Sequence, residues 1–392
     1  MTGIRPGPGP RFGHLVAKPE LACTAACPTC ATRKALHRGL RRQDFLAFAD
    51  WQALFGEARE LGASRLTISG GEPMLYDRLA DMIAEGKRCG WRVDVNTNGS
   101  RTPGNVAPRL LAAGLDAVVV SLYAGDASIH DRMRNRDGLW RQAVETVEAF
   151  VAERQRAPGV GVGMQTIVCR DNFRSFPDLL RLAYRLGVGT LTFSYLEGDY
   201  AERRFLLDEA EVSEFKRRIV PEALAVIRAT AADPWARRVA AAAVRSLYAG
   251  GAKREKDYAQ GIYRRPRPCP VPSFFSIVLA NGDVHPCNMV EYAHQPVIGN
   301  LRQSRFTDLW SGPAWRDFRR RGFSLCRYCP VPAQTVIPIS GRPILAPLQV
   351  AFCGRPLRWA WPFARRLMIR RRRFLKRTKP PVRPSAHGRQ GD

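Results

Sequence analysis

The segment "LLAAGLDAVVVSL" (residues 110–122) joins an apolar helical stretch to a β-rich run through a single glycine, Gly114. A glycine just past the last helical turn adopts the left-handed conformation that ends a helix. The run Ala117–Val120 that follows is continuous and apolar, which is typical of a strand buried on both faces of a parallel sheet. The segment therefore predicts a helix–glycine–strand unit.

The same unit recurs through the first half of the chain. Glycines precede three further predicted strands: Gly62 before Leu66–Ile68, Gly90 before Val93–Val95 and Gly187 before Thr190–Phe193. "HLVAKPEL" (14–21) and "VGVGMQTIV" (160–168) add two more strands. Alternating strands and helices predict a parallel sheet with crossover helices. About six such units predict an α/β fold, a partial (β/α)6 TIM barrel, with its chemistry on the loops that follow the strands.

The composition indicates a folded protein without a membrane span. The chain has 392 residues, of which 45% are hydrophobic, so it is not a disordered polymer. Apolar runs of about 18 residues are absent, and the N-terminus lacks the apolar region of a signal peptide. We therefore expect a cytoplasmic protein in a reducing compartment, where clustered cysteines point to metal rather than to disulfides.

The net charge of +27 is concentrated at the C-terminus, where residues 354–392 carry 13 Lys and Arg against one acid. A basic surface attracts phosphates, nucleic acid or anionic lipid. In "WAWPFARRLMIRRRRFLKR" (359–377) apolar side chains recur at helical spacing between arginines. This tail is interpreted as a helix on an anionic membrane surface, as an RNA-binding segment or as a disordered basic tail. The helical spacing favours the membrane over RNA.

Three cysteines, Cys23, Cys27 and Cys30, directly follow the first predicted strand in "CTAACPTC" (23–30). Zinc sites usually combine four ligands in paired short spacings, whereas the next candidate ligand, His37, lies seven residues beyond Cys30. Three protein ligands on a 4Fe–4S cluster would leave one iron open for another group. The spacing therefore favours a cluster over zinc.

Cys-x-x-x-Cys-x-x-Cys after the first strand of a partial β/α barrel resembles the radical S-adenosylmethionine (radical SAM) superfamily. The resemblance implies that the catalytic residues Cys23, Cys27 and Cys30 hold a 4Fe–4S cluster whose open iron binds SAM. It also implies reductive cleavage of SAM to a 5′-deoxyadenosyl radical, which abstracts a hydrogen atom from the substrate. The family usually has an aromatic residue before the third cysteine, and this chain has Thr29 there.

Four further motifs follow in the family's order, namely "ISGGEP" (68–73), "NTNG" (96–99), "SLY" (121–123) and "HDRMR" (130–134). The resemblance assigns these residues to SAM: Gly70, Gly71, Glu72, Asn96, Asn98, Ser121 and Arg134. Arg134 suits bidentate binding of the SAM carboxylate, with a solvated surface charge as the alternative.

Two later segments add candidates. "QTIVCRDN" (165–172) resembles the family's fifth-strand segment, with Gln165 and Asn172 as site groups. "FSYLEGDY" (193–200) closes the sixth predicted strand, where acids and tyrosines are expected to hold a hydroxylated substrate or to accept a proton. Those candidates are Tyr195, Glu197, Asp199 and Tyr200, and a capped strand end with surface acids is the alternative.

A second set of cysteines comprises Cys269, Cys287, Cys326 and Cys329. "NGDVHPC" (281–287) predicts a tight turn between two strands. By spacing alone the four thiols would satisfy zinc. However, this region resembles the SPASM extension of radical SAM enzymes, or its shorter relative Twitch, which implies one auxiliary 4Fe–4S cluster on these four cysteines. Cys353 is interpreted as a bystander, and Cys89 and Cys169 as core thiols.

The predicted domains are an N-terminal arm (1–11), the barrel (12–207), a helical connection (208–263), the SPASM/Twitch-like domain (264–332) and a Pro-punctuated segment with the basic tail (333–392). The resemblance implies an oxidoreductase or maturase acting on a peptide or a small hydroxylated metabolite, with electrons from a reductant such as flavodoxin or ferredoxin. The alternative is a cysteine-rich metal-binding scaffold that binds RNA or an anionic membrane through its tail. The ordered "GGEP", "NTNG" and "SLY" segments favour the enzyme.

Overall fold

Residues 12–30, 42–101, 104–156, 159–196, 200–262, 269, 271–287, 297–321 and 335–340 are described by the computed structural model. The chain divides into two units, Met1–Gly354 and Arg355–Asp392. The second unit, which holds the basic tail, lies outside the described residues, so a membrane- or RNA-binding tail stays a prediction. Within the described ranges, the helices are too short or too polar to span a bilayer.

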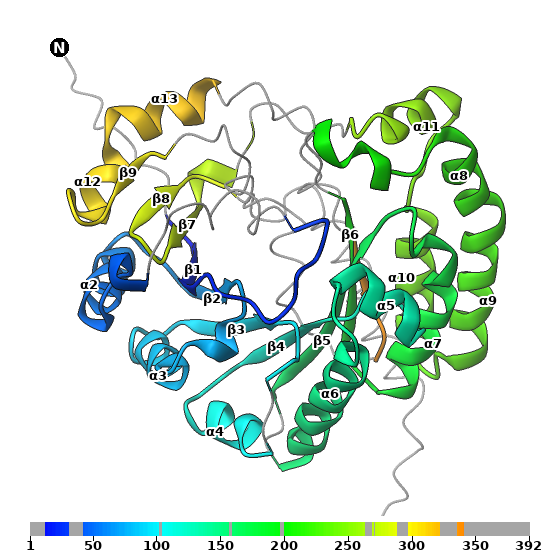
Figure 1. The fold of residues 1–392 in the computed structure, drawn as a ribbon, viewed down its shortest axis with the longest axis horizontal. Helices are drawn as coiled ribbons and strands as arrows, with labels where there is room; N and C mark the ends of the chain where they lie inside the picture. The colour runs from blue at the N-terminus through cyan, green and yellow to red at the C-terminus, as the bar shows by residue number, and fades with distance from the viewer. Residues whose placement is uncertain are drawn as a thin grey trace, which may run out of the picture. The chain divides into compact units, whose positions relative to one another are not determined.

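Six parallel strands form the centre of the fold and pair in chain order. They are β1 (His14–Glu20), β2 (Arg65–Gly70), β3 (Arg92–Thr97), β4 (Ala117–Ser121), β5 (Gly161–Val168) and β6 (Thr190–Tyr195). Figure 1 shows these strands following one another around an arc. The predicted partial β/α barrel is therefore confirmed.

Helices cover the outer side of this arc (Figure 1). They are α2 (Phe48–Glu60), α3 (Leu79–Arg88), α4 (Val106–Ala112), α6 (Leu139–Arg156) and α7 (Phe176–Arg185), with α5 (Ala127–Arg134) beside them. Gly62, Gly90, Gly114 and Gly187 all have positive φ, as the predicted helix stops require. Fully buried side chains such as Trp51, Leu66 and Val118 fill the layer between helices and strands.

The opposite face of the barrel strands is mostly polar. Side chains alternate along a strand, and Leu66, Val95 and Val118 occupy the helix-facing positions. The alternate positions include the apolar Val16, Val119 and Ile167 but are mostly polar, with His14, Lys18, Thr67, Asp94, Asn96, Ser121, Gln165, Thr192 and Ser194. A complete β/α barrel fills its interior with branched apolar side chains. The inner face of this sheet is instead suited to a polar ligand.

Strands from the C-terminal part extend both edges of the barrel sheet. The predicted hairpin is confirmed as β7 (Phe275–Leu279) and β8 (Asp283–His285), and the sequence did not indicate that β7 pairs in parallel with β1. β9 (Gly299–Asn300) follows β8, while β10 (Thr335–Pro338) pairs antiparallel with β6 at the other edge. Pairing of this kind satisfies the backbone groups that an open barrel would leave exposed.

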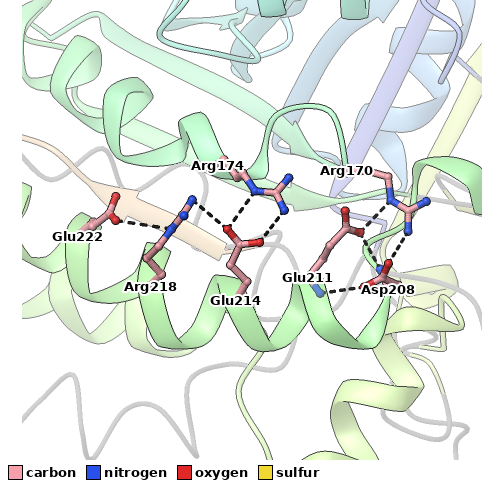
Figure 2. A network of polar contacts seen from close by, with 7 residues as sticks. All are labelled: Arg170, Arg174, Asp208, Glu211, Glu214, Arg218 and Glu222. Atoms are coloured by element: carbon pink, nitrogen blue, oxygen red, sulfur yellow. Dashed lines mark hydrogen bonds and ion pairs between the residues drawn. The ribbon is translucent and has the colours of Figure 1, made fainter.

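A helical segment follows β6, as predicted: α8 (Glu209–Glu214), the π-helical turn η5 (Phe215–Ile219), α9 (Val220–Thr230), α10 (Pro234–Arg245) and α11 (Ala252–Ala259). Asp208 and Glu211 form a capping box at the start of α8. Arginines after β5 fasten this segment to the barrel through the ion pairs drawn in Figure 2. Arg170 binds Glu211 at 2.8 Å, and Arg174 binds Glu214 at 2.6 Å.

Candidate active site

The cysteine loop after β1 packs directly on the backbone of the "GGEP" turn. Gly71 N–H donates to the carbonyl of Glu20, and Glu72 N–H donates to that of Ala22, both at 2.8 Å. A Cβ on Gly70 would lie 2.1 Å from the Glu20 carbonyl oxygen, and one on Gly71 would lie 2.2 Å from that of Ala22. Both positions therefore need glycine because the chain itself approaches so closely.

The carboxylate of Glu72 is fully buried, and both of its oxygens accept hydrogen bonds from other residues of the chain. Its oxygens accept hydrogen bonds from the Met74 backbone N–H at 3.0 Å, the Thr97 hydroxyl at 2.7 Å and the Asn98 backbone N–H at 2.7 Å. Burial raises the pKa of Glu72, and these three donors oppose that rise. Glu72 thus joins the ends of β2 and β3 beneath the cysteine loop.

The end of α5 holds the cysteine loop from another side. The Ala26 backbone N–H donates to the Arg134 carbonyl at 3.0 Å, and the Arg136 guanidinium donates to the Thr24 carbonyl at 2.9 Å. Asn135 ends the helix with a left-handed backbone. The sequence did not single out Arg136, since no motif marks a side chain that binds a backbone carbonyl.

Arg134 is buried, contrary to the alternative of a solvated charge. Its guanidinium lies 4.6 Å from the centre of the Tyr123 ring. Its Nε is buried and has no hydrogen-bond partner among the described residues. A buried guanidinium with an unmatched donor is a favourable partner for an incoming carboxylate.

The three cysteine thiols form no disulfide among the described residues and differ in exposure. Cys23 is exposed, while Cys27 and Cys30 are partly buried, and the Cys30 N–H donates to the Cys27 carbonyl. Burial raises the pKa of the Cys27 thiol, and the nearby Arg134 charge opposes that rise. Within the described ranges, no three potential ligands form a ready-made site for one metal ion. The positive charge near the thiols fits an anionic cluster of thiolates.

The other predicted barrel residues have different environments. Asn96, Ser121 and Gln165 are partly buried on the inner face, where β4 and β5 align Ser121 with Gln165. Asn172 is buried, and its side-chain amide joins the segment after β4 to the end of β5 by donating to the Tyr123 and Ile167 carbonyls at 2.7 and 2.8 Å. Asn172 is therefore a structural brace.

The prediction that Tyr195 lies at the site is wrong. Tyr195 is buried on the helix side of β6, and its hydroxyl accepts the Tyr248 backbone N–H at 3.0 Å. Its ring stacks on Tyr258 with centres 5.7 Å apart. Alternation along β6 puts Tyr195 on the same side as Phe193, in an aromatic cluster beneath the helices. Glu197, Asp199 and the Tyr200 side chain lie outside the described residues.

The second cysteine set is described only in part. Cys269 and Cys287 both pack against one small apolar cluster, made of Val16, Val271, Phe275, Ile277 and Leu279. The structure thus brings these two cysteines to a common region, and their ligation of one auxiliary cluster stays a prediction. Cys326 and Cys329 lie outside the described residues, as does Cys353. Of the two thiols interpreted as core residues, Cys169 is buried and Cys89 is partly buried.

A clamp from α13 (Pro313–Arg321) holds the turn between Cys269 and β7. The Pro272 carbonyl accepts hydrogen bonds from Trp315 Nε1 at 2.8 Å and from Arg319 Nε at 2.9 Å. The Arg319 guanidinium lies 4.1 Å from the centre of the Trp310 ring, and burial lowers the pKa of Arg319 to about 10. This clamp fixes the segment three residues after Cys269.

The described cysteines of the two sets lie toward opposite ends of the paired strands β1 and β7. The loop with Cys23 follows the carboxyl end of β1, whereas Cys269 precedes β7. His285 on β8 pairs with Ile277, so Cys287 comes level with the start of β7. The seven residues of β1 span roughly 20 Å, because a strand rises about 3.3 Å per residue.

Comparison with known proteins places this geometry in a family. The chain is 27% identical over 315 residues to a PqqA peptide cyclase of Xanthomonas campestris pv. campestris, covering 79% of this chain and 76% of that protein. It is 28% identical over 335 residues to the PqqA peptide cyclase of a Methylobacterium strain, covering 84% and 81%. The fold is similar to that of Streptococcus suis SuiB bound to precursor peptide SuiA, with a TM-score of 0.58, 15% identity and coverage of 82% and 72%.

Two family models match the chain. The model of the radical SAM superfamily matches residues 21–216, which is half of the chain. The SPASM model, an iron–sulfur cluster-binding domain, matches residues 269–330. The chain is therefore an enzyme whose cofactors are a 4Fe–4S cluster, SAM and auxiliary iron–sulfur, and it belongs to the radical SAM superfamily.

Proposed function

We propose that the chain modifies a peptide by abstracting hydrogen from it with a SAM-derived radical. The observation that carries the proposal is the similarity to PqqA peptide cyclases along 79% of the chain, through both the barrel and the iron–sulfur domain. The polar inner face of the barrel strands supports a polar substrate. The alternative substrate is a small hydroxylated metabolite. It is less favoured because Tyr195, one of its candidate contacts, is buried away from the inner face.

In this proposal Cys23, Cys27 and Cys30 hold the SAM-binding cluster, which supplies the electron that cleaves SAM. The protein orients SAM and excludes water from the radical. Arg134 binds the SAM carboxylate together with Ser121, which is supported by the buried, unmatched Nε of Arg134. Gly70 and Gly71 allow the "GGEP" turn to contact the cysteine loop, and Glu72 keeps that turn in place.

The auxiliary cluster is proposed to be a single one, bound by Cys269, Cys287, Cys326 and Cys329. The apolar residues against which both Cys269 and Cys287 pack support this assignment. The auxiliary iron–sulfur cluster would then lie toward the N-terminal end of β1. This position suits a role as acceptor for the electron left on the substrate radical. We also propose that the domains span residues 12–207, 208–263 and 264–332. We propose that the electron donor is a reductant of the flavodoxin or ferredoxin type. A cytoplasmic enzyme whose basic tail contacts anionic membranes is likewise a proposal.

The substrate class is tested with the reconstituted full-length enzyme, SAM and dithionite. A cell extract of the source organism is divided by size into a peptide fraction and a small-metabolite fraction. We expect the peptide fraction to stimulate 5′-deoxyadenosine formation and to yield a peptide of altered mass, and protease treatment of that fraction to abolish both. Stimulation by the small-metabolite fraction alone would contradict the proposal. The Cys23→Ala, Cys27→Ala, Cys30→Ala triple variant is the control for adventitious cleavage.

A further inference from the structure

Asn98 has a fixed orientation at the end of β3. Its side chain is buried, at 3% exposure, and its backbone N–H donates to the Glu72 carboxylate at 2.7 Å. The side-chain oxygen accepts the Ser100 backbone N–H at 2.8 Å. Because a backbone N–H can only donate, this bond assigns the amide oxygen to the Ser100 side. The amide nitrogen must then face the cysteine loop.

The amide nitrogen of Asn98 contacts the first cysteine directly. Nδ2 donates to Cys23 Sγ at 3.5 Å and to Thr24 Oγ1 at 3.1 Å. The Ala25 backbone N–H donates to the same Cys23 sulfur at 3.5 Å. The sulfur therefore accepts one backbone and one side-chain hydrogen bond.

These contacts engage both N–H donors of the Asn98 side chain and one of the two lone pairs of its oxygen. An amide has two N–H donors, which go to Cys23 and Thr24, and its oxygen is bound by Ser100. A hydrogen bond donated by the Asn98 amide to SAM would require its bond to Cys23 or to Thr24 to break. The geometry instead connects Asn98 to the thiolate.

We propose that Asn98 is a positioning residue that holds Cys23 and, through its N–H···S bond, raises the reduction potential of the SAM-binding cluster. The inference rests on the proposed ligation of that cluster by Cys23. An iron–sulfur cluster gains negative charge when it is reduced, and hydrogen bonds to its sulfurs stabilise that charge. Asn98 is itself held by Glu72, whose carboxylate accepts the Asn98 backbone N–H at 2.7 Å.

The test is an EPR-monitored redox titration of the reconstituted full-length enzyme, in which the SAM-binding cluster is identified by the change of its signal on adding SAM. In Asn98→Leu, we expect about tenfold less reduced cluster relative to oxidised cluster at a fixed potential, equivalent to about 59 mV for one electron. Asn98→Asp keeps the acceptor for Ser100 and removes the amide donor, so its potential should also fall. Thr24→Val removes the other partner of Asn98 and should leave the potential unchanged.

Three results would overturn the inference. A fully loaded Asn98→Leu or Asn98→Asp cluster with the wild-type potential would show that the amide does not act on the sulfur. An equal shift in Thr24→Val would assign the effect to bracing of the loop. A SAM-responsive cluster that persists in Cys23→Ala would instead contradict the proposed ligand set, which separates failure of the site assignment from failure of the Asn98 role.

Discussion

The two cysteine regions of this chain are held in place by different forces. The loop with Cys23, Cys27 and Cys30 rests on hydrogen bonds from β2, β3 and α5, with the Glu72 carboxylate at their centre. The region of Cys269 and Cys287 rests on a small apolar cluster and on the Trp315–Arg319 clamp.

This difference predicts different sensitivities to mutation. Hydrogen bonds are directional, and a buried group that loses its partner costs the full penalty of desolvation. Apolar packing tolerates substitutions of similar volume. A change of one atom should therefore disturb the first region, whereas the second should respond mainly to loss of the clamp that fixes the turn after Cys269.

The largest effect is expected from Gly71→Ala. The added Cβ would lie 2.2 Å from the Ala22 carbonyl oxygen and 2.4 Å from that of Leu21, so the backbone of the cysteine loop must move. We expect loss of the SAM-responsive cluster and of SAM cleavage, with the auxiliary cluster retained, measured by EPR and by 5′-deoxyadenosine formation. Gly56→Ala, where the Cβ meets nothing within 4 Å, is the matched control and should keep both. Normal SAM cleavage by Gly71→Ala would refute the close-approach argument.

The next effect is expected from Glu72→Gln. One carboxylate oxygen accepts the Met74 N–H and the other accepts the Asn98 N–H, so in either orientation the new NH2 group faces a backbone N–H. We expect a loss of about 3 kcal/mol in the free energy of unfolding, measured by urea denaturation of the apoprotein. Glu60→Gln, on the exposed surface of α2, should change it by less than about 0.5 kcal/mol. Equal stabilities of the two variants would contradict the central place of Glu72.

Arg319→Met tests the second region. Methionine keeps apolar volume against Trp310 and loses the hydrogen bonds to the Pro272 and Trp310 carbonyls. We expect the unfolding free energy to fall by about 2 kcal/mol and the auxiliary cluster to be depleted, while SAM cleavage persists. Arg320→Met on the same helix removes only an exposed pair with Asp317 and should have little effect. Depletion of the SAM-binding cluster instead would break the distinction between the regions.

His130 gives an effect that is small near neutral pH and grows as the solution is acidified, so it is measured in the pH dependence of stability. Burial lowers the pKa of His130 to about 3, and its Nδ1 accepts the Tyr123 backbone N–H. The folded state stays neutral where the unfolded histidine, with a pKa near 6.5, binds a proton, so stability falls as the pH drops from about 6.5 toward 3. We expect His130→Asn, which keeps an acceptor, to weaken this decline by up to about 1.4 kcal/mol per pH unit in urea titrations. An unchanged slope would mean that His130 is protonated in the fold.

The sequence predicted the barrel well because its helix ends and strands are each marked by patterns only a few residues long. The glycines at 62, 90, 114 and 187 do adopt the positive φ that ends their helices, and the strands follow where expected. The pairing of β7 with β1 could not be predicted, since it joins segments about 260 residues apart and no short motif records it. The position of β10 beside β6 was missed for the same reason.

In the site, the sequence indicated residue types better than their contacts. Glu72 and Asn98 were singled out by motif, but their partners were not, because hydrogen bonds between separate loops depend on the folded backbone. Tyr195 was assigned to the site because it lies at the end of β6. Its side chain nevertheless faces the helices, because side chains alternate between the two faces of the strand. Arg136 and Arg319 had no signal, since both act by binding backbone carbonyls.

The most direct test of the account compares the two cysteine sets in one assay. The wild type, the Cys23→Ala, Cys27→Ala, Cys30→Ala variant and the Cys269→Ala, Cys287→Ala variant are reconstituted anaerobically and incubated with SAM and dithionite. The account predicts that 5′-deoxyadenosine forms in the wild type and in the Cys269, Cys287 variant and is absent from the first variant. Undiminished 5′-deoxyadenosine without Cys23, Cys27 and Cys30 would contradict it.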